Sequence, residues 1–179
     1  MSETPARRAH NPKAPSKQHK SALEWMKLAL KEAHKAQTLG EVPVGALIVK
    51  DNKLVSKGFN LRESKNNPIL HAELIAIQKA ARKLKSWRLI DCDLYITLEP
   101  CLMCSGAIIQ ARIRHVYIAT EDPKAGACCS LYQVFNDKRF NHQPTWETGL
   151  LKEESSLLLK TFFKNLRTKK KTRSHGPLK

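Results

Sequence analysis

Two short motifs carry side chains that can hold a metal ion. His71 and Glu73 form a His-x-Glu motif, and Cys101 and Cys104 form a Cys-x-x-Cys pair directly after Pro100. Each motif opens a segment that we expect to be helical, and cysteines at i and i+3 share one helix face. The partial positive charge at a helix N-terminus lowers the pKa of a thiol and favours the thiolate that binds metal. One imidazole and two thiolates therefore predict a zinc site with three protein ligands.

Three protein ligands are too few to close such a site. Structural zinc sites usually have four protein ligands, whereas catalytic sites keep one position for water. The rival donors are Cys128 and Cys129, but adjacent residues in an expected loop match a helix-borne fourth ligand poorly. We therefore predict a zinc ion that keeps an open position for water.

Glu73 is the candidate proton shuttle. It follows His71 by two residues, so it lies near the metal without having to ligate it. Zinc lowers the pKa of a bound water to about 7, and a neighbouring carboxylate can take its proton. His-x-Glu followed by Pro-Cys-x-x-Cys is the signature of zinc-dependent nucleobase deaminases. The two motifs in this order predict attack of water on a nucleobase carbon, with Glu73 returning protons to the ring nitrogen and the departing ammonia.

The segments around these motifs predict alternating helices and strands. Ser21 and Glu24 form a capping box that opens a helix ending near Gly40. Two apolar runs joined by a turn at 51–53 predict a hairpin. The order of elements predicts an α/β fold, and the early hairpin makes its sheet mixed. The expected strands are 44–50, 54–59, 94–98, 116–119 and 145–148, and the later helices are 72–84, 101–111 and 153–170.

The positive charge of the chain is concentrated at its two ends. The 179 residues carry a formal net charge of +16. Residues 1–20 contribute +4 and residues 160–179 contribute +8, which leaves only +4 for the 139 residues between them. Basic ends attract polyanions, of which nucleic acid is the commonest. The alternative is a pair of solvated tails that keep the protein in solution.

The composition of the chain divides it into three parts. Residues 1–20 contain three prolines and no apolar period, and we expect a disordered basic arm there; a transit peptide is the alternative. A deaminase domain is expected over 21–170 and a basic tail over 171–179. No apolar run is long enough to span a bilayer, so we expect no membrane partner and a cytoplasmic location. The odd number of cysteines, five, favours metal chemistry over a disulfide framework.

The chain resembles the cytidine deaminase superfamily, and most closely the bacterial transfer RNA adenosine deaminases. Residues 97–107 match the T-L-E-P-C-x-M-C-x-G-A run of that family. Residues 41–46 are similar to its first strand, 122–127 to a later loop and 162–167 to its terminal helix. Together these similarities cover most of residues 21–170.

The resemblance implies a fold, a cofactor and an assembly. The fold would be a three-layer α/β/α sandwich with a five-stranded mixed sheet, and the protein a homodimer. His71, Cys101 and Cys104 would bind one zinc ion per subunit, and Glu73 would be the catalytic proton donor. The reaction would be hydrolytic deamination of adenosine to inosine at the wobble position of a tRNA anticodon.

The resemblance also implies a set of substrate-binding residues. Asn60 would hydrogen bond the target base, and Asp122 and Lys124 would contact the flanking nucleotides of an anticodon stem-loop. In the terminal helix, Phe162 is expected to pack on the core, because Leu158, Phe162 and Leu166 share one face. Phe163 is turned about 100° from Phe162 and, with Arg167, is expected to meet RNA. Glu99 is expected to stabilise backbone, and the core is expected to hold Trp25, Trp87 and Trp146.

Two other functions remain open from the sequence. One is a zinc-dependent deaminase of a free base or nucleoside, of guanine or cytidine type, because the P-C-x-M-C-x-G-A run also occurs in free-base deaminases. The other is an RNA-binding module that keeps zinc for structure alone. Glu73 argues against the second, since a structural zinc site needs no proton shuttle.

Overall fold

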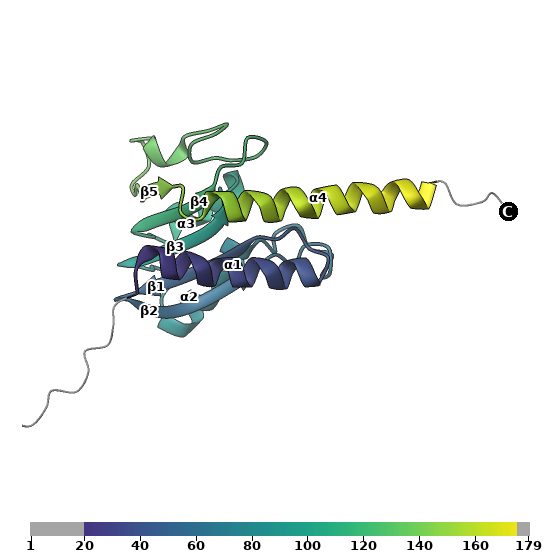
Figure 1. Cartoon of the computed structure of the whole chain (residues 1–179). Coiled ribbons are helices and arrows are strands. Elements are labelled where there is room, and N and C mark those ends of the chain that lie inside the picture. The colour runs from purple at the N-terminus through teal and green to yellow at the C-terminus, as the bar shows by residue number, and fades with distance from the viewer. Residues whose placement is uncertain (1–19, 175–179) are drawn as a thin grey trace, which may run out of the picture.

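The fold is built on a single mixed sheet. The computed structural model describes residues 20–174, with side chains described as far as residue 169. Within this range the five strands have the order β2-β1-β3-β4-β5 (Figure 1). The elements are α1 (Ala22–Thr38), β1 (Gly45–Lys50), β2 (Lys53–Phe59), α2 (Ala72–Leu84), β3 (Cys92–Leu98), α3 (Leu102–Gln110), β4 (His115–Thr120), the 3-10 helix η1 (Val134–Asn136), β5 (Thr145–Thr148) and α4 (Lys152–Ser174).

The strand directions confirm the expected mixed sheet. β1 pairs antiparallel with both β2 and β3, whereas β3, β4 and β5 run parallel. The hairpin turns at Asp51 and Asn52, whose φ angles are 49° and 52°. Positive φ at two central residues suits the two-residue turn that matches the twist of a hairpin. Because β3 and β4 are parallel, their carboxyl ends lie at the same edge of the sheet.

Helices cover both faces of the sheet, which confirms the three-layer arrangement. α1 and α4 lie on one face, and α2 and α3 lie on the other (Figure 1). Glycine allows two of these helices to approach closely. A Cβ on Gly45 would lie 2.2 Å from the carbonyl oxygen of Ala29, and one on Gly58 would lie 2.3 Å from that of Ala72. The capping box that opens α1 is present, with Ser21 and Glu24 bonded reciprocally.

Helix α4 packs on the sheet only through its first half. The Ser155 hydroxyl donates to the carbonyl oxygen of Thr97 at 2.6 Å, and Leu158 is buried. Figure 1 shows the helix running on past the end of the sheet, and the side chains after Phe162 are exposed as far as residue 169. Phe162 is half-buried, whereas Leu166 on the same helical face is exposed, because no sheet lies beneath that turn.

The structure also tests the expected positions of the tryptophans. Trp25 is buried and Trp146 packs partly buried against the core, but Trp87 is 54% exposed, so its assignment to the core was wrong. Residues 1–19 and 175–179, which include most of the expected arm and the end of the expected tail, lie outside the described residues. Among the helices that are described, none has the length and apolar character needed to cross a membrane.

Candidate active site

A cavity of about 640 Å³ opens where β3 and β4 end and where α2 and α3 begin. The carboxyl ends of parallel strands are a common place for ligands in open α/β sheets. Its floor includes His71, Glu73 and Cys101, and its wall includes Asn60. The cavity therefore brings together the metal-ligand motifs and the residue expected to bind the base.

The metal motifs meet as a compact cluster. The Nδ1 atom of His71 lies 3.8 Å from the Sγ of Cys101 and 3.5 Å from the Sγ of Cys104, and all three donor atoms lie within 4.8 Å of one another. His71 and Cys101 are the N-cap residues of α2 and α3, and neither side chain caps its own helix. Their donor atoms are therefore left for a metal ion.

The hydrogen bonds within the cluster favour the thiolate form of Cys101, which is the form that binds metal. A hydrogen bond from the Cys104 thiol, with a second from His71, lowers the pKa of Cys101 to about 3. The same contact raises the pKa of Cys104, which therefore keeps its proton while no metal is bound. A metal ion replaces that proton and holds both sulfurs as thiolates. Two thiolates and one imidazole fit zinc, and the cluster has room for one ion.

Glu73 lies in the first turn of α2 and faces the cavity from beside the cluster. Its side chain is buried, and the residue is only 3% exposed. Burial raises the pKa of this carboxyl to about 7. Such a carboxyl can both take and give a proton near neutral pH, which suits general acid–base chemistry.

Asn60 has a structural contact as well as a place in the cavity wall. It is buried, and its Oδ1 atom accepts a hydrogen bond from the N–H of Ala72 at 2.9 Å. That N–H belongs to the first residue of α2, whose own N-cap residue, His71, does not cap it. Its Nδ2 group has no partner among the described residues. This amide group is therefore available as a donor at the cavity.

Glu99 organises the loop that follows β4. Its Oε1 atom accepts the backbone N–H groups of Cys128, Cys129 and Ser130 at 2.8–3.0 Å. Its Oε2 atom accepts the N–H of Asp122 at 2.9 Å and the hydroxyl of Ser130. Although burial opposes ionisation, these hydrogen bonds lower the pKa of Glu99. The expectation that Glu99 stabilises backbone is confirmed.

Glu41 holds the loop between β2 and α2 in the same way. The residue is fully buried, and its carboxylate accepts the N–H groups of Glu63 at 3.1 Å and Ser64 at 2.7 Å. These bonds hold the loop between β2 and α2, which leads to His71. Sequence reasoning missed this residue, because nothing in the pattern at 41–46 reveals a carboxylate that binds a loop more than twenty positions away.

The residues expected to contact RNA surround the cavity mouth. Asp122, Lys124, Phe163 and Arg167 all line it, and Phe163 is 41% exposed. One carboxylate oxygen of Asp122 accepts the N–H groups of Lys124 and Ala125, which fixes the turn at 122–125. Arg62 and Lys160, which sequence reasoning did not single out, also line the cavity.

Fold and site together define a class of protein. A buried carboxylate beside a His-Cys-Cys cluster, in an α/β/α sandwich, is the arrangement of a zinc-dependent nucleobase deaminase. The family model for the cytidine and deoxycytidylate deaminase zinc-binding region matches residues 19–120, which is more than half of the chain.

Individual relatives show which deaminases within this class are similar to the chain. A tRNA-specific adenosine deaminase of Streptococcus pyogenes serotype M3 is 44% identical over 151 residues, which cover 84% of this chain and 88% of that protein. A structure from a study of A-to-I editing by tRNA:A34 deaminases at the wobble position of transfer RNA is 41% identical, with a TM-score of 0.73, and covers 75% of this chain and 97% of its own. A guanine deaminase of Bacillus subtilis is 28% identical, with a TM-score of 0.55, and covers 83% of this chain and 95% of its own. The chain belongs to the cytidine and deoxycytidylate deaminase family, in its branch of tRNA-specific adenosine deaminases.

Proposed function

We propose that this protein converts adenosine to inosine at the wobble position of a tRNA anticodon. The observation that carries the proposal is a metal cluster and a buried carboxyl on the floor of a cavity whose mouth is basic and aromatic. The relatives that support an RNA substrate are more similar to this chain than the guanine deaminase is.

The proposed chemistry assigns a task to each residue of the floor. His71, Cys101 and Cys104 hold one zinc ion per subunit, which supplies a water acidified to a pKa of about 7. Glu73 takes a proton at its carboxylate from the attacking water and delivers it to the ring nitrogen of adenine. It then moves a second proton, from the hydroxyl group that the attacking water has become, to the amino group, which leaves as ammonia. Water is consumed and the carbon that lost ammonia becomes the carbonyl of inosine.

The cavity wall supplies the proposed recognition. The Nδ2 group of Asn60 donates a hydrogen bond to the target base. Asp122 and Lys124 contact the nucleotides that flank it, from the turn that Glu99 holds in place. Phe163 stacks on a loop base and Arg167 meets a phosphate, since both line the cavity from α4. A base in a loop is partly unstacked already, which lowers the cost of extruding it into the cavity.

We also propose that the protein is a homodimer. Large apolar side chains that no described residue covers lie around the metal-binding corner, where Cys101 pairs with Gly126. A surface of this kind suits an interface between protein subunits. The exposed side chains are Ile69, Leu102, Met103, Leu131 and Tyr132.

The proposal extends to domain limits and location. The deaminase domain spans 21–170, between a basic arm at 1–20 and a basic tail at 171–179. All five cysteines lie among the described residues and none of them is in a disulfide. Free thiols suit a reducing compartment, and we place the enzyme in the cytoplasm with its tRNA substrate.

The test compares four substrates with the zinc-loaded protein. We expect inosine from an anticodon stem-loop that has adenosine at the wobble position, and far lower rates with free adenosine, guanine and cytidine. Efficient deamination of guanine or cytidine with an inert stem-loop would favour the free-base alternative. Binding of the stem-loop without any deamination would favour the RNA-binding module.

A further inference from the structure

The end of the molecule opposite the cavity carries a second concentration of positive charge. It consists of the β1–β2 hairpin at 50–54 and the last turns of α2 with the loop after them at 79–91, which we call the far-end patch. These residues include seven Lys or Arg and two Asp. The patch lies far from the metal cluster, because His71 precedes the first residue of α2, the patch includes its last turns, and its 13 residues span about 20 Å.

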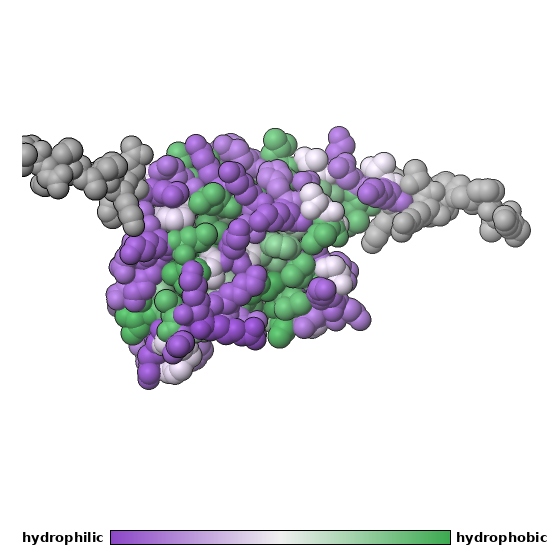
Figure 2. All heavy atoms as spheres, turned by 90° about the horizontal axis from the view of Figure 1, so that it is seen from below, coloured by the Kyte–Doolittle hydropathy of each residue, from purple (hydrophilic) through white to green (hydrophobic). Residues whose placement is uncertain are grey.

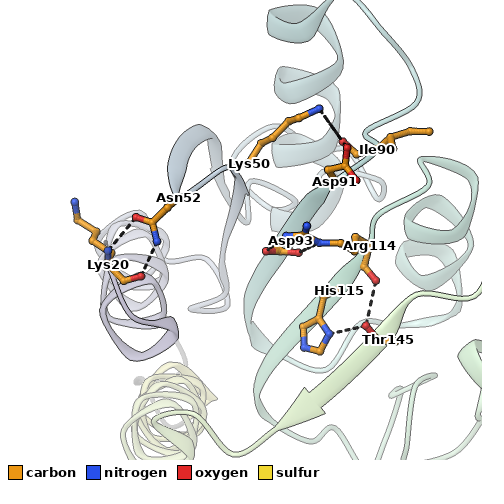
Figure 3. Close-up of polar contacts among 9 residues, drawn as sticks. All are labelled: Lys20, Lys50, Asn52, Ile90, Asp91, Asp93, Arg114, His115 and Thr145. Atoms are coloured by element: carbon orange, nitrogen blue, oxygen red, sulfur yellow. Dashed lines mark hydrogen bonds and ion pairs between the residues drawn. The ribbon is translucent and has the colours of Figure 1, made fainter. Parts of the chain in front are cut away.

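Side-chain contacts join the parts of the far-end patch into one surface. The Nζ atom of Lys83 reaches the carbonyl oxygen of Val55 at 3.0 Å, which joins α2 to the hairpin. The Nζ atom of Lys50 reaches the carbonyl oxygen of Ile90 at 3.0 Å and the carboxylate of Asp91 at 4.0 Å, which joins the hairpin to the loop (Figure 3).

Three of the seven cations have a structural explanation. Lys79 and Lys83 hydrogen bond carbonyl oxygens of β2, an edge strand that such lysines protect from pairing with another chain. Lys50 is paired with Asp91. The other four are Lys53, Arg82, Lys85 and Arg88, which are exposed and have no ion-pair partner among the described residues.

Trp87 provides an aromatic surface among these cations. Its ring is exposed, and the guanidinium carbon of Arg88 lies 4.1 Å from the ring centroid. Leu54, Leu84 and Ile90 of the patch are also exposed. Over the face of the molecule that Figure 2 shows, apolar residues lie between hydrophilic ones. Aromatic rings among unpaired cations are the combination with which proteins bind nucleic-acid bases and backbone together.

The chain also enters the described fold at this end. The backbone N–H of Lys20 donates to Oδ1 of Asn52 at 2.9 Å, and Nδ2 of Asn52 donates to the carbonyl oxygen of Lys20 at 2.7 Å (Figure 3). The 19 residues that precede Lys20 include four Lys or Arg and one Glu. Lys20, through which these residues join the described fold, is held at the hairpin of the far-end patch.

We propose that the far-end patch binds the phosphate backbone of the tRNA substrate outside the anticodon stem-loop. This inference rests on the proposed function. A polyanion is the complementary partner for a dense set of unpaired cations. The exposed ring of Trp87 adds contact with a ribose or an unstacked base. The patch thus provides a second attachment for a substrate whose wobble base lies in the cavity.

The test measures binding of full-length tRNA and of its anticodon stem-loop at several salt concentrations. One variant combines Arg82→Gln, Lys85→Gln and Arg88→Gln, and a second carries Trp87→Ala. The control combines Lys27→Gln, Lys31→Gln and Lys138→Gln, which removes the same charge from exposed positions outside the patch. Zinc content and deamination of the stem-loop serve as measures of an intact fold.

We expect the triple patch variant to weaken binding of full-length tRNA, and to reduce its salt slope by about 0.7–0.9 for each phosphate that the protein no longer neutralises. Trp87→Ala should weaken the same binding at least about fivefold. Stem-loop binding and deamination should stay as in the control. Equal tRNA affinity in patch and control variants would overturn the inference, and so would an equal loss with the stem-loop. Failure of the unmodified protein to deaminate the stem-loop would instead contradict the proposed function.

Discussion

At the scale of single residues, the site depends on two N-cap positions whose side chains do not cap. N-caps are usually Ser, Thr, Asp or Asn, because their side chains bond the free N–H groups of the first turn. His71 and Cys101 take these positions and turn their donor atoms toward each other. At the start of α2, the side chain of Asn60 accepts the N–H of Ala72, which the side chain of His71 leaves free. Metal binding and helix capping are thus divided between neighbouring residues.

The first prediction concerns the metal ligands. Cys101→Ser and Cys104→Ser should each lose most of the zinc that the unmodified protein holds, because a hydroxyl is a poor replacement for a thiolate. Metal analysis of the purified variants measures this. Cys129→Ser is the control, since Cys129 lies outside the cluster and should leave zinc content unchanged. Full zinc retention in both ligand variants would show that the ion is held elsewhere.

At the scale of elements, two buried carboxylates shape the cavity. Glu41 holds the loop before α2, and Glu99 holds the loop after β4. Each binds backbone N–H groups that no strand or helix satisfies, and an unsatisfied buried N–H is costly. The two loops belong to no strand or helix, but their hydrogen bonds to Glu41 and Glu99 fix their positions.

The second prediction follows from the pKa of Glu99. Glu99→Gln should lower the free energy of unfolding by about 1–3 kcal/mol at pH 7, because a neutral amide oxygen accepts these N–H bonds less strongly. The hydrogen bonds lower the folded-state pKa of Glu99 beneath the unfolded value of about 4.3. The stabilisation is therefore present above that value and is lost as pH falls through the folded-state pKa.

Urea unfolding at several pH values measures both effects. The unmodified protein should lose stability more steeply than Glu99→Gln as pH falls below about 4.3. Glu154→Gln is the matched control, because Glu154 is exposed and its carboxylate has no ion-pair partner among the described residues. If the free energy of unfolding fell equally with pH in Glu99→Gln and in the unmodified protein, the role of the carboxylate would be contradicted.

The third prediction concerns α4, whose second half leaves the sheet (Figure 1). Ending the chain after Arg167 removes five Lys or Arg. Binding of the stem-loop should then depend less on salt, by about 0.7 in the slope for each phosphate that is no longer neutralised. Zinc content should not change, because the metal cluster lies on other elements. An unchanged slope would exclude the end of α4 from RNA binding.

At the scale of the whole molecule, sequence pattern predicted what depends on local chemistry. The limits of α2 and the capping box of α1 were confirmed, since both depend on residues close in the chain. Positions set by distant packing were not predictable in the same way. Leu166 has helical spacing but no sheet beneath it, and Trp87 is apolar but exposed. Glu41 was missed because its partners are backbone groups of another loop.

The fourth prediction concerns assembly. Met103→Glu should convert the proposed dimer to a monomer, because it places a charge within the apolar surface around the metal-binding corner. Leu157→Glu is the matched control, since Leu157 is 66% exposed on α4 and outside that surface. Light scattering coupled to size-exclusion chromatography measures the mass of each. A monomeric unmodified protein, or a dimer that both variants retain, would contradict the proposed interface.

The central claim is tested most directly by a single-turnover comparison of the unmodified protein with Glu73→Gln. Each protein is loaded with zinc and used in molar excess over an anticodon stem-loop. The stem-loop has one adenosine at the wobble position and others elsewhere. We expect inosine at the wobble position alone, formed about 10²–10⁴-fold more slowly by Glu73→Gln at equal zinc content and RNA affinity. Inosine formation by Glu73→Gln at the rate of the unmodified protein, or at every adenosine alike, would contradict the account.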